Sequence, residues 1–165
     1  AANRIDYDPS MGLFSYPGDF TPSGRIVNIR GVPFRMPPLD DGKKNCILPK
    51  GQAIAVPEGS YSGVMFMGVG HDGKHPGTWT FWYADGSSQT VESQIPEWCS
   101  PPPPGPESFQ EAFGAPYRYT PHGPGPPACQ LFTWTLKPDP TRTLKGIQLP
   151  TMEKGAYLFA ITLLK

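Results

Sequence analysis

Charged side chains are scarce in this 165-residue sequence, and they cancel, with 14 lysines and arginines against 14 aspartates and glutamates. Proteins that bind nucleic acid usually carry a basic excess, so this balance argues against a nucleic-acid partner. No apolar run approaches the ~20 residues that a membrane-spanning helix needs, and we expect no membrane association. Because the length suits one core and no internal repeat is present, we predict a single domain over residues 1–165.

The sequence also lacks the motifs that usually mark an active site. Its histidines, His71, His75 and His122, form no H-E-x-x-H pattern, and there is no G-x-S-x-G elbow. The spacing of His71 and His75 would suit a metal on a helix, but glycines and a proline around them exclude a helix there. No two carboxylates are visibly paired as glycosidases require. We therefore predict that the protein is not an enzyme.

Cysteine is rare, and its placement leaves three possibilities open. Cys46, Cys99 and Cys129 include no C-x-x-C pair, so a zinc site is not expected. In a secreted protein, a Cys99–Cys129 disulfide would tie down the chain between them, and Cys46–Cys99 is the alternative pairing. Three reduced, buried thiols are the third possibility.

Glycine and proline, at 19 and 23 residues, are abundant and separate short runs rich in β-branched and aromatic residues. This distribution is typical of all-β proteins, and an aromatic content of 12% argues against disorder. We predict strands and no helix, with the strands at residues 25–36 (a pair), 52–56, 61–69, 78–83, 89–91, 115–120, 130–136, 144–149 and 156–164. The predicted fold is an all-β, antiparallel two-sheet β-sandwich or jelly roll, with a proline-rich surface excursion at residues 100–127.

A predicted β-hairpin is the most informative part of the chain. Asp85 and Gly86 lie between two strand-like runs, and this pair readily takes the positive φ angles of a tight turn. Trp79 and Phe81 are assigned to the core. Trp82 is out of phase with both, so we predict that it lies on the solvent-facing side of the sheet. An exposed tryptophan there would form a platform on the sheet face.

Several motifs follow one another in a specific order: T-x-T-x-x-Y-x-D-G-S at 78–87, E-W-C at 97–99, Y-R at 117–118, F-T-W-T-L-K-P-D-P-T-R-T-L at 132–144 and I-Q-L-P at 147–150. Their order resembles a β-sandwich module of secreted bacterial proteins, which is often attached to glycoside hydrolases and is similar to galactose-binding jelly rolls. The resemblance implies a secreted, non-catalytic carbohydrate-binding module that holds a linked catalytic domain close to a polysaccharide or oligosaccharide. The alternative is a structural or protein-interaction β-sandwich without a sugar site.

Candidate sugar contacts are aromatic rings, which pack on the C–H faces of sugars, and planar polar groups, which bind hydroxyls. They are His71, Asp72, Trp82, Trp98, Tyr117, Arg118 and Tyr119. In a strand, Tyr117 and Tyr119 would share one face and Arg118 would point to the other. The alternative interpretation is that Trp98 caps the core and Arg118 forms a salt bridge.

The resemblance also implies a structural Ca²⁺ held by carboxylates near the termini, since calcium takes oxygen ligands. Asp6 and Asp8 are the candidate ligands. Asp19 and the acidic turn at residues 40–42 are further carboxylates, and no EF-hand spacing is present.

Overall fold

Strands and no helix are found among the residues that the computed structural model describes, which are 4–6, 15–17, 22–38, 40, 43–101, 109–120, 122–153 and 155–165. In chain order the strands are β1 (Arg4–Asp6), β2 (Ser15–Pro17), β3 (Ile26–Ile29), β4 (Val32–Arg35), β5 (Ala53–Gly59), β6 (Gly63–Gly70), β7 (His75–Tyr83), β8 (Ser88–Ile95), β9 (Gln110–Ala115), β10 (Arg118–Thr120), β11 (Gly123–Gly125), β12 (Cys129–Leu136), β13 (Leu144–Gln148) and β14 (Ala156–Leu164).

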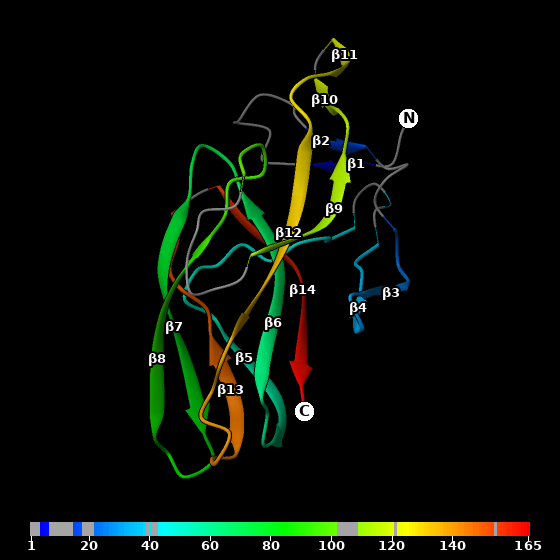
Figure 1. The fold of residues 1–165 in the computed structure, drawn as a ribbon. Helices are drawn as coiled ribbons and strands as arrows, with labels where there is room; N and C mark the ends of the chain where they lie inside the picture. Colours follow the sequence, from blue (N-terminus) through cyan, green and yellow to red (C-terminus); the bar gives the residue numbers. More distant parts are fainter. Residues whose placement is uncertain are drawn as a thin grey trace.

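Two antiparallel four-stranded sheets form the body of the protein (Figure 1). One has the strand order β14-β6-β12-β9 and the other the order β5-β13-β7-β8. We call them the inner sheet and the outer sheet, because further elements cover the first, while one face of the second meets solvent. The predicted all-β, two-sheet β-sandwich is confirmed.

Strand β6 explains why the sandwich has two cores. It confirms the strand predicted at residues 61–69, and all eight of its residues are buried. Val64 and Phe66 pack between the two sheets with Trp79 and Trp134. Met65, Met67 and Val69, which alternate with them, belong to a second core on the opposite face of the inner sheet. Because side chains alternate along a strand, a strand that is apolar throughout requires a cover on both faces.

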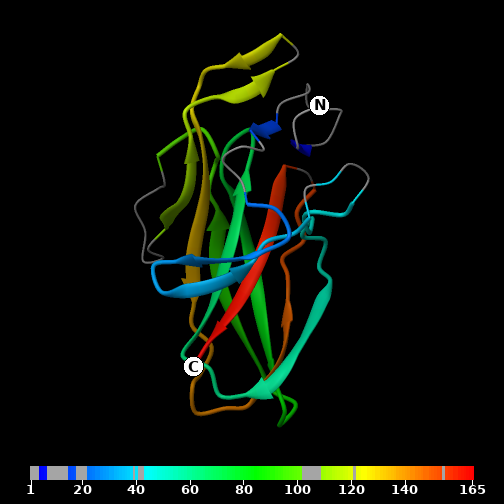
Figure 2. The same cartoon turned by 90° about the vertical axis from the view of Figure 1, so that its right-hand side faces the viewer.

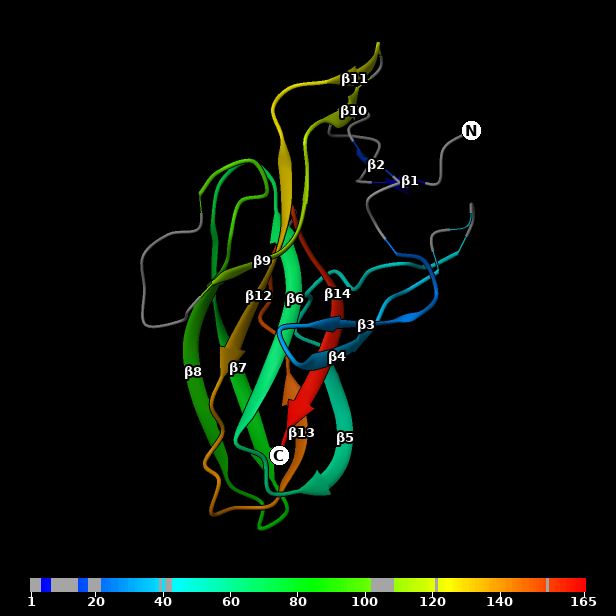
Figure 3. The same ribbon diagram turned by 45° about the vertical axis from the view of Figure 1, so that its right-hand side comes forward.

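The hairpin β3–β4 supplies the second cover. It lies across β14 on the far side of the inner sheet (Figures 2 and 3). Phe34 and Met36 enter the second core and are 0% and 1% exposed. The strand pair predicted at residues 25–36 is confirmed, and it turns at Arg30 and Gly31, whose φ angles are 52° and 86°. A third layer therefore packs on a sandwich that the sequence predicted as two sheets.

The hairpin β7–β8 is also confirmed. Gly86 has a φ angle of 86°, and the Ser87 amide donates a 2.9 Å hydrogen bond to Asp85 Oδ1. Such a bond closes the turn locally, as aspartate commonly does. Two long neighbouring strands of the outer sheet are thereby fixed in register, with Trp79 opposite Val91 and Trp82 opposite Ser88.

The region predicted as a proline-rich excursion contains strands. Residues 110–115 form β9, the edge strand of the inner sheet next to β12. The predicted strand at 115–120 is broken, and β10 begins only at Arg118. With β11, β1 and β2 it forms a small sheet at one end of the sandwich (Figure 1). Pairing with distant strands, which no local pattern shows, makes strands of residues 110–115 and 118–120.

Candidate functional site

The exposed face of the outer sheet carries one tryptophan. Along β7, Trp79, Phe81 and Tyr83 face the core and are at most 1% exposed, whereas Trp82 is 37% exposed. Trp82 lies beside Gly146 of β13, which has no side chain to cover it. The prediction from sequence that Trp82 lies on the solvent-facing side of the sheet is therefore confirmed.

A polar cavity begins one step along the same face of β7. It has a volume of about 360 Å³ and is lined by Gly77, Thr78, Thr80, Gln148, Leu149, Pro150 and Thr151. Thr78 Oγ1 donates a 2.6 Å hydrogen bond to Glu92 on β8, and Gln148 Nε2 donates one of 3.2 Å to the Gly51 carbonyl. Hydroxyl and amide groups are thus held in place beside Trp82.

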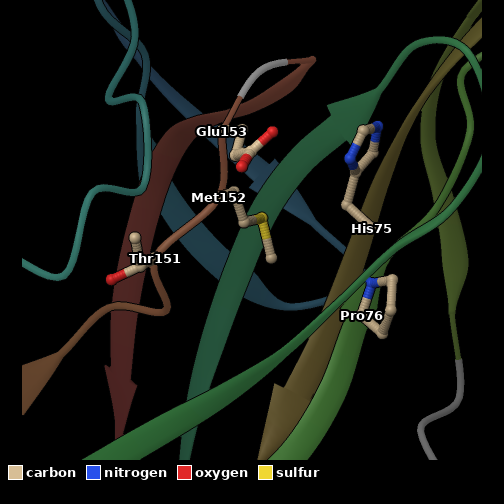
Figure 4. A pocket seen from close by; sticks show the side chains of 5 residues that line it. All are labelled: His75, Pro76, Thr151, Met152 and Glu153. Carbon is tan, nitrogen blue, oxygen red and sulfur yellow. The ribbon is translucent and has the colours of Figure 1, made fainter.

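A second cavity shares one lining residue with the first. It has a volume of about 400 Å³ and is lined by His75, Pro76, Thr151, Met152 and Glu153 (Figure 4). Thr151 lines both cavities. We call the two cavities, together with Trp82, the β7 groove. Trp82 and the first cavity lie on the outward face of β7, whereas His75 has the strand phase of the core-facing Trp79. Its walls are β7 from His75 to Trp82 and the segment 148–153 that follows the body of β13.

His75 is held in one orientation by a hydrogen bond to the backbone. Its Nε2 lies 2.8 Å from the His71 carbonyl oxygen. Because a carbonyl only accepts, this nitrogen carries a proton and donates it. The ring packs against two glycines: a Cβ at Gly155 would lie 3.0 Å from His75 Cε1, and one at Gly70 would lie closer still. The glycines therefore leave room for the imidazole.

His71 and Asp72 lie in the loop before β7, as predicted, but only Asp72 is exposed. His71 is 7% exposed, with Nδ1 3.0 Å from Asp72 Oδ2 and Nε2 3.4 Å from the Tyr157 hydroxyl. Its imidazole therefore supports the loop from inside. The contribution of His71 to the groove is its carbonyl, which orients His75.

Trp98 does not present its ring to solvent. It is 4% exposed and packs in the second core. This agrees with the alternative interpretation of the sequence, in which Trp98 caps the core. The Arg118 guanidinium carbon lies 5.6 Å from the centre of its ring, a cation–π arrangement. Tyr117 and Tyr119 meet edge to face, with ring centres 5.6 Å apart. None of these four residues is among those that line the two cavities.

Sequence reasoning missed most of the groove. Gln148, Thr151 and Glu153 were not among the candidate residues, and His75 was considered only as a metal ligand. Thr78 and Thr80 share the phase of Trp82 in β7, so the alternation that exposed the tryptophan also pointed to them. Nothing local in the sequence pointed to the segment 148–153, because it reaches the groove by pairing of β13 with β7.

The metal prediction falls largely outside the described residues. Asp6 is described only as part of β1, and Asp8 and Asp19 lie outside. Within the described ranges, no group of three or more histidine, cysteine, aspartate or glutamate side chains is arranged to hold a metal ion. The same ranges contain no helix with the length and apolarity needed to cross a membrane. The calcium ion stays a prediction.

All three cysteines are free thiols, so neither predicted disulfide is present. Cys129 is fully buried, and Cys46 and Cys99 are half-buried against the same core. Burial raises the pKa of Cys46 and of Cys99 to about 11, and that of Cys129 to about 12, because a thiolate is poorly solvated there. The third of the possibilities that the sequence left open, three reduced thiols, is the one found.

Alkylation of these thiols is expected to be about 100-fold slower in the folded protein than in urea at about pH 8, since only the thiolate reacts. The raised pKa values also make the stability of the fold depend on pH. The contribution of the protonated thiols is fully present below pH 9.0, and it is lost as the pH rises to 11–12 and the thiols ionise in the folded protein. Iodoacetamide labelling followed by mass spectrometry measures the rates. Equal rates in the folded and unfolded protein, or a thiol that stays unlabelled in urea without reductant, would contradict this assignment.

Comparison with known proteins gives a family and no ligand. Residues 1–101 match the family model described as the AziU2-like beta-sandwich domain. The match includes β7 with Trp82 and His75, and it ends before β9 and the segment 148–153. No curated protein matches the chain. The description supports the predicted β-sandwich module and says nothing of carbohydrate or of an attached glycoside hydrolase. Because the match covers more than half of its length, the chain belongs to the family of AziU2-like beta-sandwich domains.

Proposed function

We propose that this domain binds carbohydrate along the β7 groove, without catalysis. The observation that carries the proposal is Trp82, an exposed indole on a sheet face whose neighbouring groups are hydroxyls and amides. An aromatic ring offers a flat apolar surface for the C–H face of a sugar ring. Ligand sites combine such a surface with a few positioned polar groups, which decide orientation and specificity.

The polar groups of the groove suit a polyhydroxylated ligand. Thr78 and Thr80 each present a hydroxyl that both donates and accepts, and Gln148 adds an amide. Thr78 and Gln148 already have hydrogen-bond partners, so binding would cost little ordering of these side chains. Because strands rise by ~3.3 Å per residue, the track from Trp82 to Pro76 is roughly 20 Å long, which favours a linear oligosaccharide over a single sugar.

The wider setting is part of the same proposal. A secreted module of this kind would hold a linked catalytic domain at its polymer and raise the local concentration of substrate. A structural calcium ion near the N-terminus would serve stability and take no part in binding. Neither the linked catalytic domain nor the calcium ion is needed for the groove to bind its ligand.

Affinity electrophoresis tests the proposal directly. The domain is run in native gels that contain xylan, mannan, β-glucan, xyloglucan, galactan or pectin, with and without calcium. Retardation by at least one of these classes is expected. If the folded domain migrates unchanged in every gel, carbohydrate binding is refuted and a structural or protein-interaction role takes its place.

A further inference from the structure

Gly146 lies inside β13, a strand that pairs with a neighbour on each side. Glycine weakens such a strand, because it has no side chain to pack and loses more backbone freedom than any other residue. A positive φ angle would justify it, but Gly146 is not among the described glycines that have one. A bulge lies next to it, and the type of bulge that needs glycine also needs that positive angle. The backbone conformation therefore does not require glycine here.

The space above Gly146 is open. A Cβ at this position would lie 3.5 Å from the Ile54 carbonyl oxygen and 3.9 Å from Trp82 Cβ, and both are ordinary contact distances. At Gly77 of β7, by contrast, a Cβ would lie 2.6 Å from Pro150 Cβ, so close packing accounts for that glycine. Neither conformation nor packing excludes a side chain at Gly146. What the glycine does is leave room beside Trp82.

This room belongs to a row of residues that crosses the outer sheet. Ser88 of β8, Trp82 of β7, Gly146 of β13 and Ala55 of β5 are paired one after another across the strands. Directly opposite residues share a face of the sheet, and Ser88, Trp82 and Ala55 are all exposed. On the β5 side of Trp82, the row therefore carries only a hydrogen atom and a methyl group. We call Gly146 and Ala55 the shelf, and because neighbouring strands lie ~4.8 Å apart, it extends roughly 10 Å from Trp82.

We propose that the shelf holds a side group of the bound glycan, which makes Gly146 a specificity-determining residue. The first cavity continues from Trp82 along β7, past Thr80, whereas the shelf extends across the strands. A ligand that fills both directions is branched at the sugar that stacks on Trp82. The ligand class is therefore a polysaccharide whose main chain carries short side groups. The inference rests on the proposed function, because the main chain must first be seated on Trp82.

The shelf suits a neutral sugar as the side group. The Ala55 methyl group and the Gly146 backbone offer a flat surface for a sugar ring, and neither residue carries a charge. In the next row, Gln148 lies between Thr80 and Ala53 and supplies an amide that can bond a sugar hydroxyl. Apolar contact and one amide group are thus available to a single neutral sugar beside the indole.

Three pairs of oligosaccharides, matched in main-chain length, test this assignment: β-1,4-glucan with xyloglucan, xylan with arabinoxylan, and mannan with galactomannan. Isothermal titration calorimetry measures the dissociation constants. In each pair that binds, we expect the substituted member to bind roughly fivefold more tightly, as burial of a few tens of Å² of apolar surface provides. Equal affinity within every pair, preference for the unsubstituted member, or binding of none of the six by a domain that another polysaccharide retards would overturn the inference.

Variants of the row show whether the shelf is responsible. Gly146→Val fills the shelf next to the indole and is expected to bring the affinity ratio within a pair to one. Ala55→Leu fills the other half, at an exposed position of an edge strand, and should lower the ratio by roughly twofold. The matched control is Ser88→Val, which adds bulk beside Trp82 on the opposite side and should leave the ratio unchanged. An unchanged ratio in Gly146→Val, or an equal loss in Ser88→Val, overturns the inference.

Urea denaturation separates room for a ligand from a need of the fold. Valine has a higher strand propensity than glycine, so Gly146→Val should unfold at the same urea concentration as the wild type or at a higher one. A markedly lower midpoint would show that the fold itself requires the glycine, and would overturn the inference. If unsubstituted oligosaccharides bind, Trp82→Ala removes that binding and substituted ones bind no better, only this inference fails. If no glycan binds at all, the proposed function fails with it.

Discussion

Replacement of Trp82 by alanine is expected to abolish the retardation of the domain in gels that contain its polysaccharide. Aromatic anchors dominate many binding interfaces, and removing one typically costs about 2 kcal/mol or more, which is roughly a 30-fold loss of affinity. The domain should stay folded, because Trp82 lies outside both cores. We expect its free energy of unfolding to change by about 1 kcal/mol or less. Native gels and urea denaturation measure the two effects.

A matched variant tests whether any exposed apolar side chain would cause retardation in the gel. Ile26 on β3 is 58% exposed and belongs to the hairpin on the far side of the inner sheet. Ile26→Ala should leave retardation unchanged. A Trp82→Ala protein retarded like the wild type would exclude Trp82 as the platform. Loss of retardation in both variants would indicate non-specific adhesion to the gel polymer.

Replacement of Phe34 by alanine is expected to lower the free energy of unfolding by about 3–5 kcal/mol, the usual cost of truncating a buried phenylalanine. Phe34 is 0% exposed and packs in the second core with Met67 and Phe159. Nearby, the Thr162 hydroxyl donates a 2.7 Å hydrogen bond to the Pro33 carbonyl, which fastens β4 to the C-terminal strand. The hairpin is therefore part of the folded body, and loss of its anchor should destabilise the whole.

Urea denaturation followed by tryptophan fluorescence and circular dichroism measures this effect. The control is Arg35→Ala, since Arg35 follows Phe34 on the same strand and is exposed. Its free energy of unfolding should change by about 0.5 kcal/mol or less. A Phe34→Ala variant as stable as Arg35→Ala would show that the hairpin contributes nothing to the fold. Two separate transitions would show that it unfolds on its own.

Predictions from sequence were most successful where the residue pattern within a single strand indicated which side chains are buried. The alternation along β7 placed Trp79 and Phe81 inside and Trp82 outside without reference to any other strand. The uninterrupted apolar run of β6 required burial on both faces, and both are buried. These inferences hold because the period of a strand is two whatever the strand pairs with.

Predictions failed where the outcome depends on distant partners. Residues 110–115 are poor in β-branched residues, and only pairing with β12 makes them a strand. Trp98 follows a strand in a segment that resembles an exposed loop, but its backbone is bonded to Gly70 and Gln130, and this places the ring in the second core. Neither contact is visible in the local sequence.

The sequence by itself determined the all-β class, the two hairpins β3–β4 and β7–β8, and the outward direction of Trp82. Each depends on turn residues or on alternation within one segment, which act over a few residues. Only the tertiary structure decided that β3–β4 covers a second core, that Trp98 is buried, and that residues 148–153 lie beside β7 to complete the groove. These features follow from pairing and packing between segments far apart in the chain, and burial of apolar surface selects among many such arrangements.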